Sequence, residues 1–234
     1  MIAVTGAMDE EIRLLRARMT SCVEERAAKI RISLGKFGDA DIALAQCGIG
    51  KVNAAICAQI LIDRYAPEAL LFSGVAGGLL PNMNVGDIVV ASHLIQWDVD
   101  LTAFGRRHGE IPGVGRQLEA DPKLVQQAAS AFDEAFKGNG RNPSLMIGTV
   151  VSADRFIEDP EKLRWLQREF SALATKMEGA AIAHTCCVNE APFVVVRAVS
   201  DGAGDSASKD FQANLSLAAK NCSALLERLI PAVG

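Results

Sequence analysis

The chain has 234 residues, of which 50% are hydrophobic and 22% are charged, and this composition excludes an intrinsically disordered protein. Its 24 Lys and Arg residues and 28 Asp and Glu residues give a net charge of −4, so the basic excess of a nucleic-acid-binding protein is absent. The longest apolar runs, such as residues 193–196, are far shorter than the ~20 residues of a membrane-spanning helix.

The cysteines indicate a cellular compartment. Six are present, none of them in a C-x-x-C pair, and they lie within apolar stretches. This pattern is typical of reduced, buried thiols, and we expect a soluble cytoplasmic protein. Acidic residues at positions 9–11 come before the hydrophobic segment of a signal peptide could form. The three histidines are too far apart for zinc-ligand spacing, so we expect no metal.

The first half of the chain alternates short apolar runs with helical patterns. Residues 2–4 form an apolar run that predicts a buried strand, and residue 9 opens an amphipathic helix. Alternating residues 30–37 and the run 42–45, with a Gly-Asp turn between them, predict a β-hairpin. A helix is expected over 51–65, a strand over 70–73 and a glycine-rich turn over 74–78.

The second half continues the alternation. We expect strands over 88–91, 146–152 and 193–199, and helices over 124–136, 160–170, 178–187 and 211–229. Residues 98–115 are rich in Gly and Pro and predict a long loop. Because neither a linker nor a repeat interrupts the pattern, the sequence predicts one three-layer αβα domain, residues 1–234, around a central mixed twisted sheet.

Lone carboxylates and glycine turns recur just after the apolar runs, where ligands of α/β sheets bind. Glu11 follows the first predicted strand, Glu178 begins a helix, and Asp201 follows the apolar run 193–199. Each has a simpler interpretation, because acids are common in first turns and at the caps of helices. Together, three carboxylates from three distant segments indicate a possible acid–base site.

These segments resemble the 5′-methylthioadenosine/S-adenosylhomocysteine nucleosidases of the purine nucleoside phosphorylase superfamily. The match keeps the family order along nearly the whole chain. It rests on GAMDEE (6–11), GIGKVNAA (48–55), SGVAGGL (73–79), VGDIVVA (85–91), DVDLTAFG (98–105), SADRFI (152–157), MEGAAIAH (177–184) and PFVVVRAVSD (192–201).

The resemblance implies a nucleoside phosphorylase-like fold and hydrolysis of the N-glycosidic bond of 5′-methylthioadenosine and S-adenosylhomocysteine, and also of 5′-deoxyadenosine. The products are adenine and a 5-thioribose, in methionine salvage. The family needs no metal or organic cofactor and works as a homodimer, so we expect a small-molecule adenine nucleoside as substrate and a second copy as partner, with no nucleic acid or membrane.

The resemblance also implies roles for individual residues. Asp201 is expected to be the general acid that protonates the leaving adenine at N7, and Glu11 the carboxylate that deprotonates the attacking water. Such acid–base catalysis is typically worth about 10²–10⁴-fold. Glu178 is expected to hold the ribose hydroxyls, beside Met177. Arg197 is expected to position the carboxylates.

The remaining expected contacts surround the base, the sugar and the sulfur substituent. Each of these side chains has ordinary packing as its alternative interpretation. The resemblance places Phe156 and Ile157 at the base, Gly77 beneath the sugar, Met8, Ile49, Phe156 and Phe211 at the 5′ substituent, and Leu101, Phe104 and Pro112 of the neighbouring subunit at the same substituent.

The chain departs from the family pattern at three places. Val75 stands where many members have Ser or Thr, so a hydroxyl contact to the sugar or to Glu178 is absent. Thr175 and Lys176 stand where Val-Glu is usual, which affects the local geometry around Glu178. Residues 202–208 are rich in Gly and Ser and predict a mobile flap beside Asp201.

Three alternatives remain open. A purine nucleoside phosphorylase would need to bind phosphate beside the acidic residues 9–11, which would repel it. A futalosine or aminodeoxyfutalosine hydrolase could use the same carboxylates, and sequence hardly separates it from a thioadenosine nucleosidase. A nucleoside-binding protein on the same fold is the third, because fold does not fix function.

Overall fold

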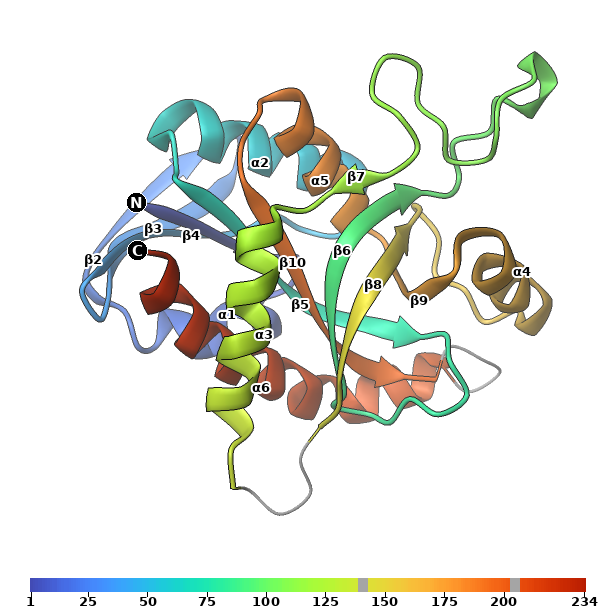
Figure 1. Ribbon diagram of the computed structural model, residues 1–234. Helices are drawn as coiled ribbons and strands as arrows, with labels where there is room; N and C mark the ends of the chain where they lie inside the picture. Colours follow the sequence, from blue (N-terminus) through green and yellow to red (C-terminus); the bar gives the residue numbers. More distant parts are fainter. Residues whose placement is uncertain (139–142, 203–206) are drawn as a thin grey trace.

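The computed structural model describes residues 1–138, 143–202 and 207–234 (Figure 1). The first half of the chain contains β1 (Ile2–Gly6), α1 (Asp9–Arg16), β2 (Thr20–Ala27), β3 (Ile30–Phe37), β4 (Ala40–Gln46), α2 (Lys51–Tyr65), β5 (Ala69–Gly78) and β6 (Ile88–Gln96). The second half contains β7 (Leu118–Glu119), α3 (Pro122–Phe136), β8 (Leu145–Ser152), α4 (Pro160–Phe170), β9 (Ala172–Lys176), α5 (Gly179–Val188), β10 (Phe193–Asp201) and α6 (Ala207–Val233).

The strands form one mixed sheet in the order β10-β6-β8-β9-β5-β1-β4-β3-β2, with β7 on the edge of β6. An additional parallel pairing of β5 with β10 closes β5, β10, β6, β8 and β9 into a ring. The parallel neighbours β4, β1, β5 and β10 run side by side, so their carboxyl ends meet at one edge. The expected mixed sheet is confirmed, and its ring closure is an addition to it.

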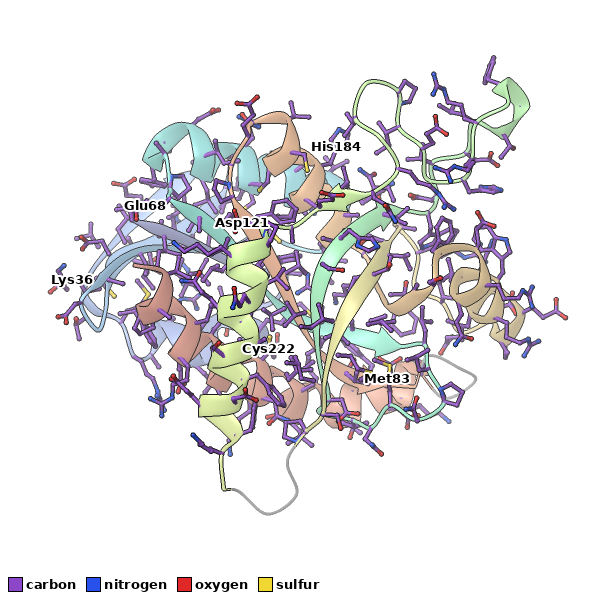
Figure 2. The ribbon with its side chains drawn as sticks, viewed as in Figure 1. Lys36, Glu68, Met83, Asp121, His184 and Cys222 are labelled. Carbon is purple, nitrogen blue, oxygen red and sulfur yellow. The ribbon has the colours of Figure 1, made fainter. Side chains whose placement is uncertain are left out.

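Helices cover both faces of the sheet, which confirms the three-layer expectation (Figure 1). Successive side chains of β5 point to opposite faces of the sheet. Leu70 and Phe72 pack in the hydrophobic cluster that includes α2 and α5, whereas Leu71 packs in the cluster that includes α1, α3 and α6. On the second face Cys222 of α6, labelled in Figure 2, has its Sγ 3.2 Å from the Ser73 Oγ of β5. The helix α4 covers a smaller cluster at the ring.

The predicted helices over 51–65 and 160–170 and the hairpin of β3 and β4 are confirmed. The predicted turn over 74–78 is wrong, because β5 continues to Gly78. Its glycines pair there with β10, Gly74 beside Arg197 and Gly77 beside Asp201, and Gly77 also with Thr175 of β9. Sequence analysis also missed the strands β2 and β9.

Two predicted boundaries near the carboxylates shift. Glu178 is the N-cap of α5 and not its first helical residue, and Asp201 is the last residue of β10. The stretch 98–115 is a loop with a single short 3₁₀ turn at Thr102–Phe104, as expected. Of the predicted flap over 202–208, residues 203–206 lie outside the described part of the chain. None of the described helices is long and apolar enough to cross a bilayer.

Candidate active site

A cavity of about 260 Å³ opens where the carboxyl ends of β5, β9 and β10 meet the turn after β1 and the start of α6. Eight residues expected at a substrate line it, namely Met8, Ile49, Gly77, Phe156, Ile157, Met177, Asp201 and Phe211. Other lining residues were not singled out from sequence as substrate contacts, namely Ala76, Arg155, Thr175, Lys176, Ser208 and Gln212.

Glu11 lies in the first turn of α1 and is only 1% exposed. Its Oε2 accepts hydrogen bonds from the backbone N–H groups of Ala7 at 2.6 Å and Met8 at 3.1 Å, so the carboxylate caps its own helix. Its Oε1 accepts from the Val75 N–H of β5 at 3.0 Å. Three backbone donors from two elements therefore fix both oxygens, and Val75 contributes through its backbone where its side chain has no hydroxyl.

Glu178 is completely buried at the N-cap of α5. Its Oε1 accepts a hydrogen bond from the Gly50 N–H at 3.0 Å, and Gly50 has a φ of +98°, a conformation that favours glycine. Among the described residues, its Oε2 has no hydrogen-bond partner. One oxygen is thus anchored to the turn before α2, and the other is available to a ligand.

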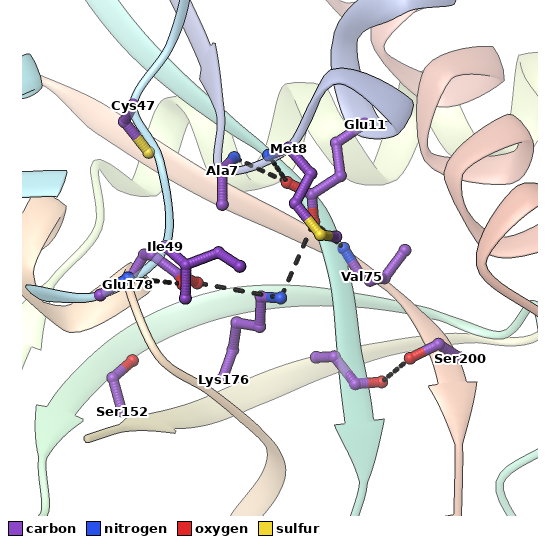
Figure 3. Close-up of polar contacts among 12 residues, drawn as sticks. Ala7, Met8, Glu11, Cys47, Ile49, Val75, Ser152, Lys176, Glu178 and Ser200 are labelled. Carbon is purple, nitrogen blue, oxygen red and sulfur yellow. Dashed lines mark hydrogen bonds and ion pairs between the residues drawn. The ribbon is translucent and has the colours of Figure 1, made fainter. Parts of the chain in front are cut away.

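Asp201 ends β10 and is 2% exposed. The hydroxyl of Ser200, labelled in Figure 3, donates a hydrogen bond to its Oδ2 at 2.8 Å. The same hydroxyl lies 3.3 Å from the Ala76 carbonyl oxygen. The register sets Asp201 beside Gly77 on β5. Sequence reasoning missed Ser200, although its place directly before the candidate acid was a signal.

Arg197 is completely buried in the middle of β10. Its guanidinium carbon lies 3.8 Å from the centre of the Phe72 ring, a cation–π contact. A Cβ on Gly74 would lie 2.4 Å from both Arg197 Nη1 and Glu11 Oε1. The strand needs glycine there so that the guanidinium and the carboxylate can both approach it. Among the described residues the three guanidinium nitrogens of Arg197 have no hydrogen-bond partner, so its expected positioning role stays a prediction.

Lys176 is the unexpected charged group of the site. Its Nζ lies 4.0 Å from Glu11 Oε1 and 3.9 Å from Glu178 Oε2, and its side chain is only 12% exposed (Figure 3). The signal in the sequence was the departure from Val-Glu before Met177. That departure adds a cation between two carboxylates.

The outer wall of the cavity is apolar and more open. Phe156 and Phe211 meet edge to face with ring centres 6.2 Å apart, and Ile49 and Phe156 are 53% and 48% exposed. Leu101, Phe104 and Pro112 do not line the cavity of their own chain. They lie on the loop 98–115, which projects from the domain at the upper right of Figure 1, and Phe104 is 82% exposed.

Thiols beneath the site are kept neutral by burial. Burial raises the pKa of Cys47, and the nearby carboxylates of Glu178 and Glu11 raise it further. Burial raises the pKa of Cys57 to about 11. Within residues 1–138, 143–202 and 207–234, no cluster of three His, Cys, Asp or Glu side chains could hold a metal ion.

Asp201 and Lys176 line the cavity, whereas the expected site residues Glu11, Glu178 and Arg197 are buried and are not among its lining residues. Glu11 and Glu178 lie next to the cavity through Lys176, whose ammonium is within 4.0 Å of both. Carboxylates in such different surroundings can divide acid and base work between them. Glycosidic bond hydrolysis needs this division, because the leaving group takes a proton while water is activated on the opposite face.

Comparisons with known proteins identify the family of the chain. The model of the phosphorylase superfamily matches residues 1–231. A 5′-methylthioadenosine/S-adenosylhomocysteine nucleosidase of Anoxybacillus flavithermus is 37% identical over 230 residues, covering 98% of this chain and 97% of the relative. A Geobacillus kaustophilus protein of the same name is 38% identical over 225 residues, covering 96% and 94%.

Solved structures extend the likeness to three dimensions. The Neisseria meningitidis nucleosidase of that name, in complex with methylthio-immucillin-A, has a TM-score of 0.94 and 35% identity, covering 99% of this chain and 98% of its own. A futalosine hydrolase of Helicobacter pylori has a TM-score of 0.92 and 31% identity, covering 99% and 97%. The chain therefore belongs to the 5′-methylthioadenosine/S-adenosylhomocysteine nucleosidase family of the phosphorylase superfamily.

Proposed function

We propose that this protein hydrolyses the N-glycosidic bond of 5′-methylthioadenosine and S-adenosylhomocysteine, and of 5′-deoxyadenosine, releasing adenine and the corresponding sugar. The observation that carries the proposal is the cavity of about 260 Å³ lined by Asp201 and Lys176, with the buried Glu11 and Glu178 within 4.0 Å of the Lys176 ammonium. Relatives with this name and a neighbour in complex with methylthio-immucillin-A support the substrate class.

In the proposed reaction Asp201 donates a proton to N7 of adenine as the C1′–N9 bond breaks and its electron pair passes to the base. A water oxygen bonds to C1′, and Glu11 takes the proton that this water loses. The three backbone donors on Glu11 hold its oxygens in place for that step. Ser200 orients Asp201 through its 2.8 Å hydrogen bond.

Substrate binding follows the cavity from its charged end to its apolar end. The Oε2 of Glu178, which has no hydrogen-bond partner among the described residues and lies 3.9 Å from Lys176 Nζ, is the proposed acceptor of the ribose hydroxyls, beside Met177 and above Gly77. A carboxylate there also stabilises positive charge on the ribose in the oxocarbenium-like transition state. Proposed contacts to the base come from Phe156 and Ile157, and proposed contacts to the 5′ substituent from Met8, Ile49, Phe156 and Phe211.

We also propose a homodimer, in which Leu101, Phe104 and Pro112 of one subunit reach the 5′ substituent in the other. Apolar side chains on the outer faces of α2 and α5 support it, because Val52 is 68% and Val188 is 64% exposed. Light scattering after size exclusion tests it, with Val52→Lys and Val188→Lys expected to yield monomers. A wild-type monomer would contradict the dimer.

The whole chain is proposed to act as one nucleosidase domain, since the family match spans residues 1–231. Its six cysteines are all free, which supports a reducing compartment such as the cytoplasm. There its proposed role is the clearance of thioether nucleosides in methionine salvage.

The deciding experiment measures adenine release from 5′-methylthioadenosine with and without phosphate and identifies the sugar. Phosphate-independent release with free 5-methylthioribose is expected. Release only with phosphate, giving a ribose 1-phosphate, would make the protein a phosphorylase. Futalosine and aminodeoxyfutalosine are assayed in parallel because a futalosine hydrolase is among the similar structures, and a higher kcat/KM for either would replace the proposed substrate.

The variant Glu178→Gln tests the proposed recognition of the ribose hydroxyls. The amide keeps an oxygen for the Gly50 N–H but removes the negative charge, so KM is expected to rise and kcat to fall. An unchanged enzyme would remove Glu178 from the site.

A further inference from the structure

Lys176 is the last residue of β9 and lies two positions before Glu178. The pairing of β9 in the sheet sets the position of Lys176. Lys176 pairs with Ser152 of β8, and the preceding Thr175 pairs with Gly77 of β5 on one side and Val151 of β8 on the other, so the backbone leading to Lys176 is held in the sheet. Its ammonium also lies 5.6 Å from the centre of the Phe211 ring, and the side chain lines the cavity.

The ammonium lies between two carboxylates that come from different elements. Glu11 Oε1 is 4.0 Å from Nζ and Glu178 Oε2 is 3.9 Å from it, and both carboxylates are almost completely buried. Two buried like charges that share a cavity make it unfavourable for both to be ionised. An opposite charge within about 4–6 Å of each favours the ionised form of both.

We propose that Lys176 is a positioning residue of this site, whose ammonium holds the buried Glu11 and Glu178 as a pair of carboxylates beside the cavity that Lys176 lines. The inference rests on the proposed function, because both carboxylates must be ionised for their proposed roles. Glu11 then stays a proton acceptor for water, and Glu178 keeps Oε2 as an acceptor for the ribose hydroxyls. Because two carboxylates of the protein already lie beside the ammonium, Lys176 does not serve as a binding site for the phosphate or carboxylate group of a ligand.

Other charges around the cavity must be considered in any pH dependence. Arg155 and Asp201 line the cavity itself, and Arg197 lies beside Glu11 at Gly74. The titratable thiol of Cys47 interacts with both glutamates, and that of Cys222 interacts with Glu11 and Arg197. Each of them is present in both wild type and a Lys176 variant, so a difference between the two profiles isolates the ammonium.

The first test is the pH dependence of kcat/KM for Lys176→Met, which keeps a long apolar stem and removes the charge. Without the ammonium the carboxylates take up protons at higher pH, so the acidic limb of the profile is expected to move upward by about one pH unit. The variant then loses about tenfold at acidic pH and recovers most of its activity at alkaline pH. Lys176→Arg, which keeps the charge, is expected to retain the wild-type limb.

Lys36→Met is the matched control for the loss of one lysine charge. Lys36 forms an exposed 2.9 Å ion pair with Asp41 on the hairpin of β3 and β4, away from the cavity (Figure 2). The pH profile of kcat/KM for Lys36→Met is expected to superimpose on that of the wild-type protein. Equal loss at every pH in Lys176→Met, or an acidic limb that does not move, would overturn the proposal.

The second test needs no turnover and therefore separates this inference from the proposed function. Glutamate labelled with ¹³C at the carboxyl carbon is titrated by NMR, and the Glu11 and Glu178 signals are assigned from Glu11→Gln and Glu178→Gln. In Lys176→Met at least one of the two signals is expected to titrate at higher pH than in wild type. If the wild-type protein is inactive but Lys176→Met shows this change in the titration of the glutamate signals, only the nucleosidase proposal is contradicted. If the wild-type protein is active but the glutamate signals titrate alike in both proteins, only the role of Lys176 is contradicted.

Discussion

The two regions around the cavity differ in how they are held. The buried polar group that we call the floor (Glu11, Glu178, Arg197 and Asp201) is at most 2% exposed, and of these four residues only Asp201 lines the cavity. Its carboxylates are bonded to backbone N–H groups or to Ser200. The apolar wall (Met8, Ile49, Phe156 and Phe211) is formed by loops and the first turns of α6, and two of its side chains are about half exposed.

This difference separates chemistry from selectivity. A floor anchored to backbone N–H groups of β5 and of the turns before α1 and α2 holds its oxygens in one geometry, as proton transfer requires. The wall contributes apolar contact area, so its side chains can be substituted without moving the floor. Such substitutions alter which 5′ substituent binds well. Substitutions in the floor should therefore lower kcat, and substitutions in the wall should mainly raise KM.

The largest effect is expected for Asp201→Asn. The amide keeps the shape and an oxygen for the Ser200 hydroxyl but cannot donate a proton as an acid, so kcat should fall by about 10²–10⁴-fold. Adenine release is the measurement, and calorimetric binding of the substrate should remain close to wild type. Near-normal turnover would remove Asp201 as the acid and break the distinction between floor and wall.

Glu11→Gln should come next, with kcat lower by about 10²-fold. The new amide group also has to face backbone N–H donors, at Val75 or at Ala7 and Met8, where a carboxylate oxygen accepted them. Leaving a buried donor unsatisfied costs about 1–3 kcal/mol, so thermal unfolding should occur at a lower Tm. A Tm equal to wild type would show that backbone anchoring of the floor has little energetic weight.

Phe156→Ala sharpens the comparison from the side of the wall. Because the ring is 48% exposed, its removal should weaken binding by about 1 kcal/mol, which raises KM about fivefold and leaves kcat nearly unchanged. Ile147→Ala on β8 removes an apolar side chain of the same 48% exposure outside the cavity and serves as the control. A fall in kcat with an unchanged KM would place Phe156 with the floor.

The smallest effect concerns the thiols beneath the floor. Burial raises the pKa of Cys57 to about 11 and of Cys186 to about 12, so both should resist iodoacetamide up to about pH 9 while the exposed Cys22 is alkylated. The unfolded state loses these protons at lower pH, so the free energy of unfolding should fall as pH rises above about 8.5. Peptide mass spectrometry checks the labelling, and rapid labelling of Cys57 would mean that the floor opens.

Sequence by itself determined the α/β class, several helices and the segments that carry the candidate site. Residues 51–65 are a clear case, because a glycine turn precedes the helix and its length and composition suffice to define it. The acids Glu11, Glu178 and Asp201 could be selected because each follows or ends an apolar segment within a recognisable motif. Local pattern and motif order are properties of the chain, so they are visible without coordinates.

Tertiary structure alone decided what these segments do together. From sequence the glycine-rich segment 74–78 looks like a turn, but its pairing with β10 and β9 makes it part of the strand β5. Lys176 looks like a departure next to Glu178, but the sheet register brings its ammonium to within 4.0 Å of Glu11, 165 positions earlier in the chain. Distances between residues so far apart in sequence depend on strand pairing and packing, which local propensity does not encode.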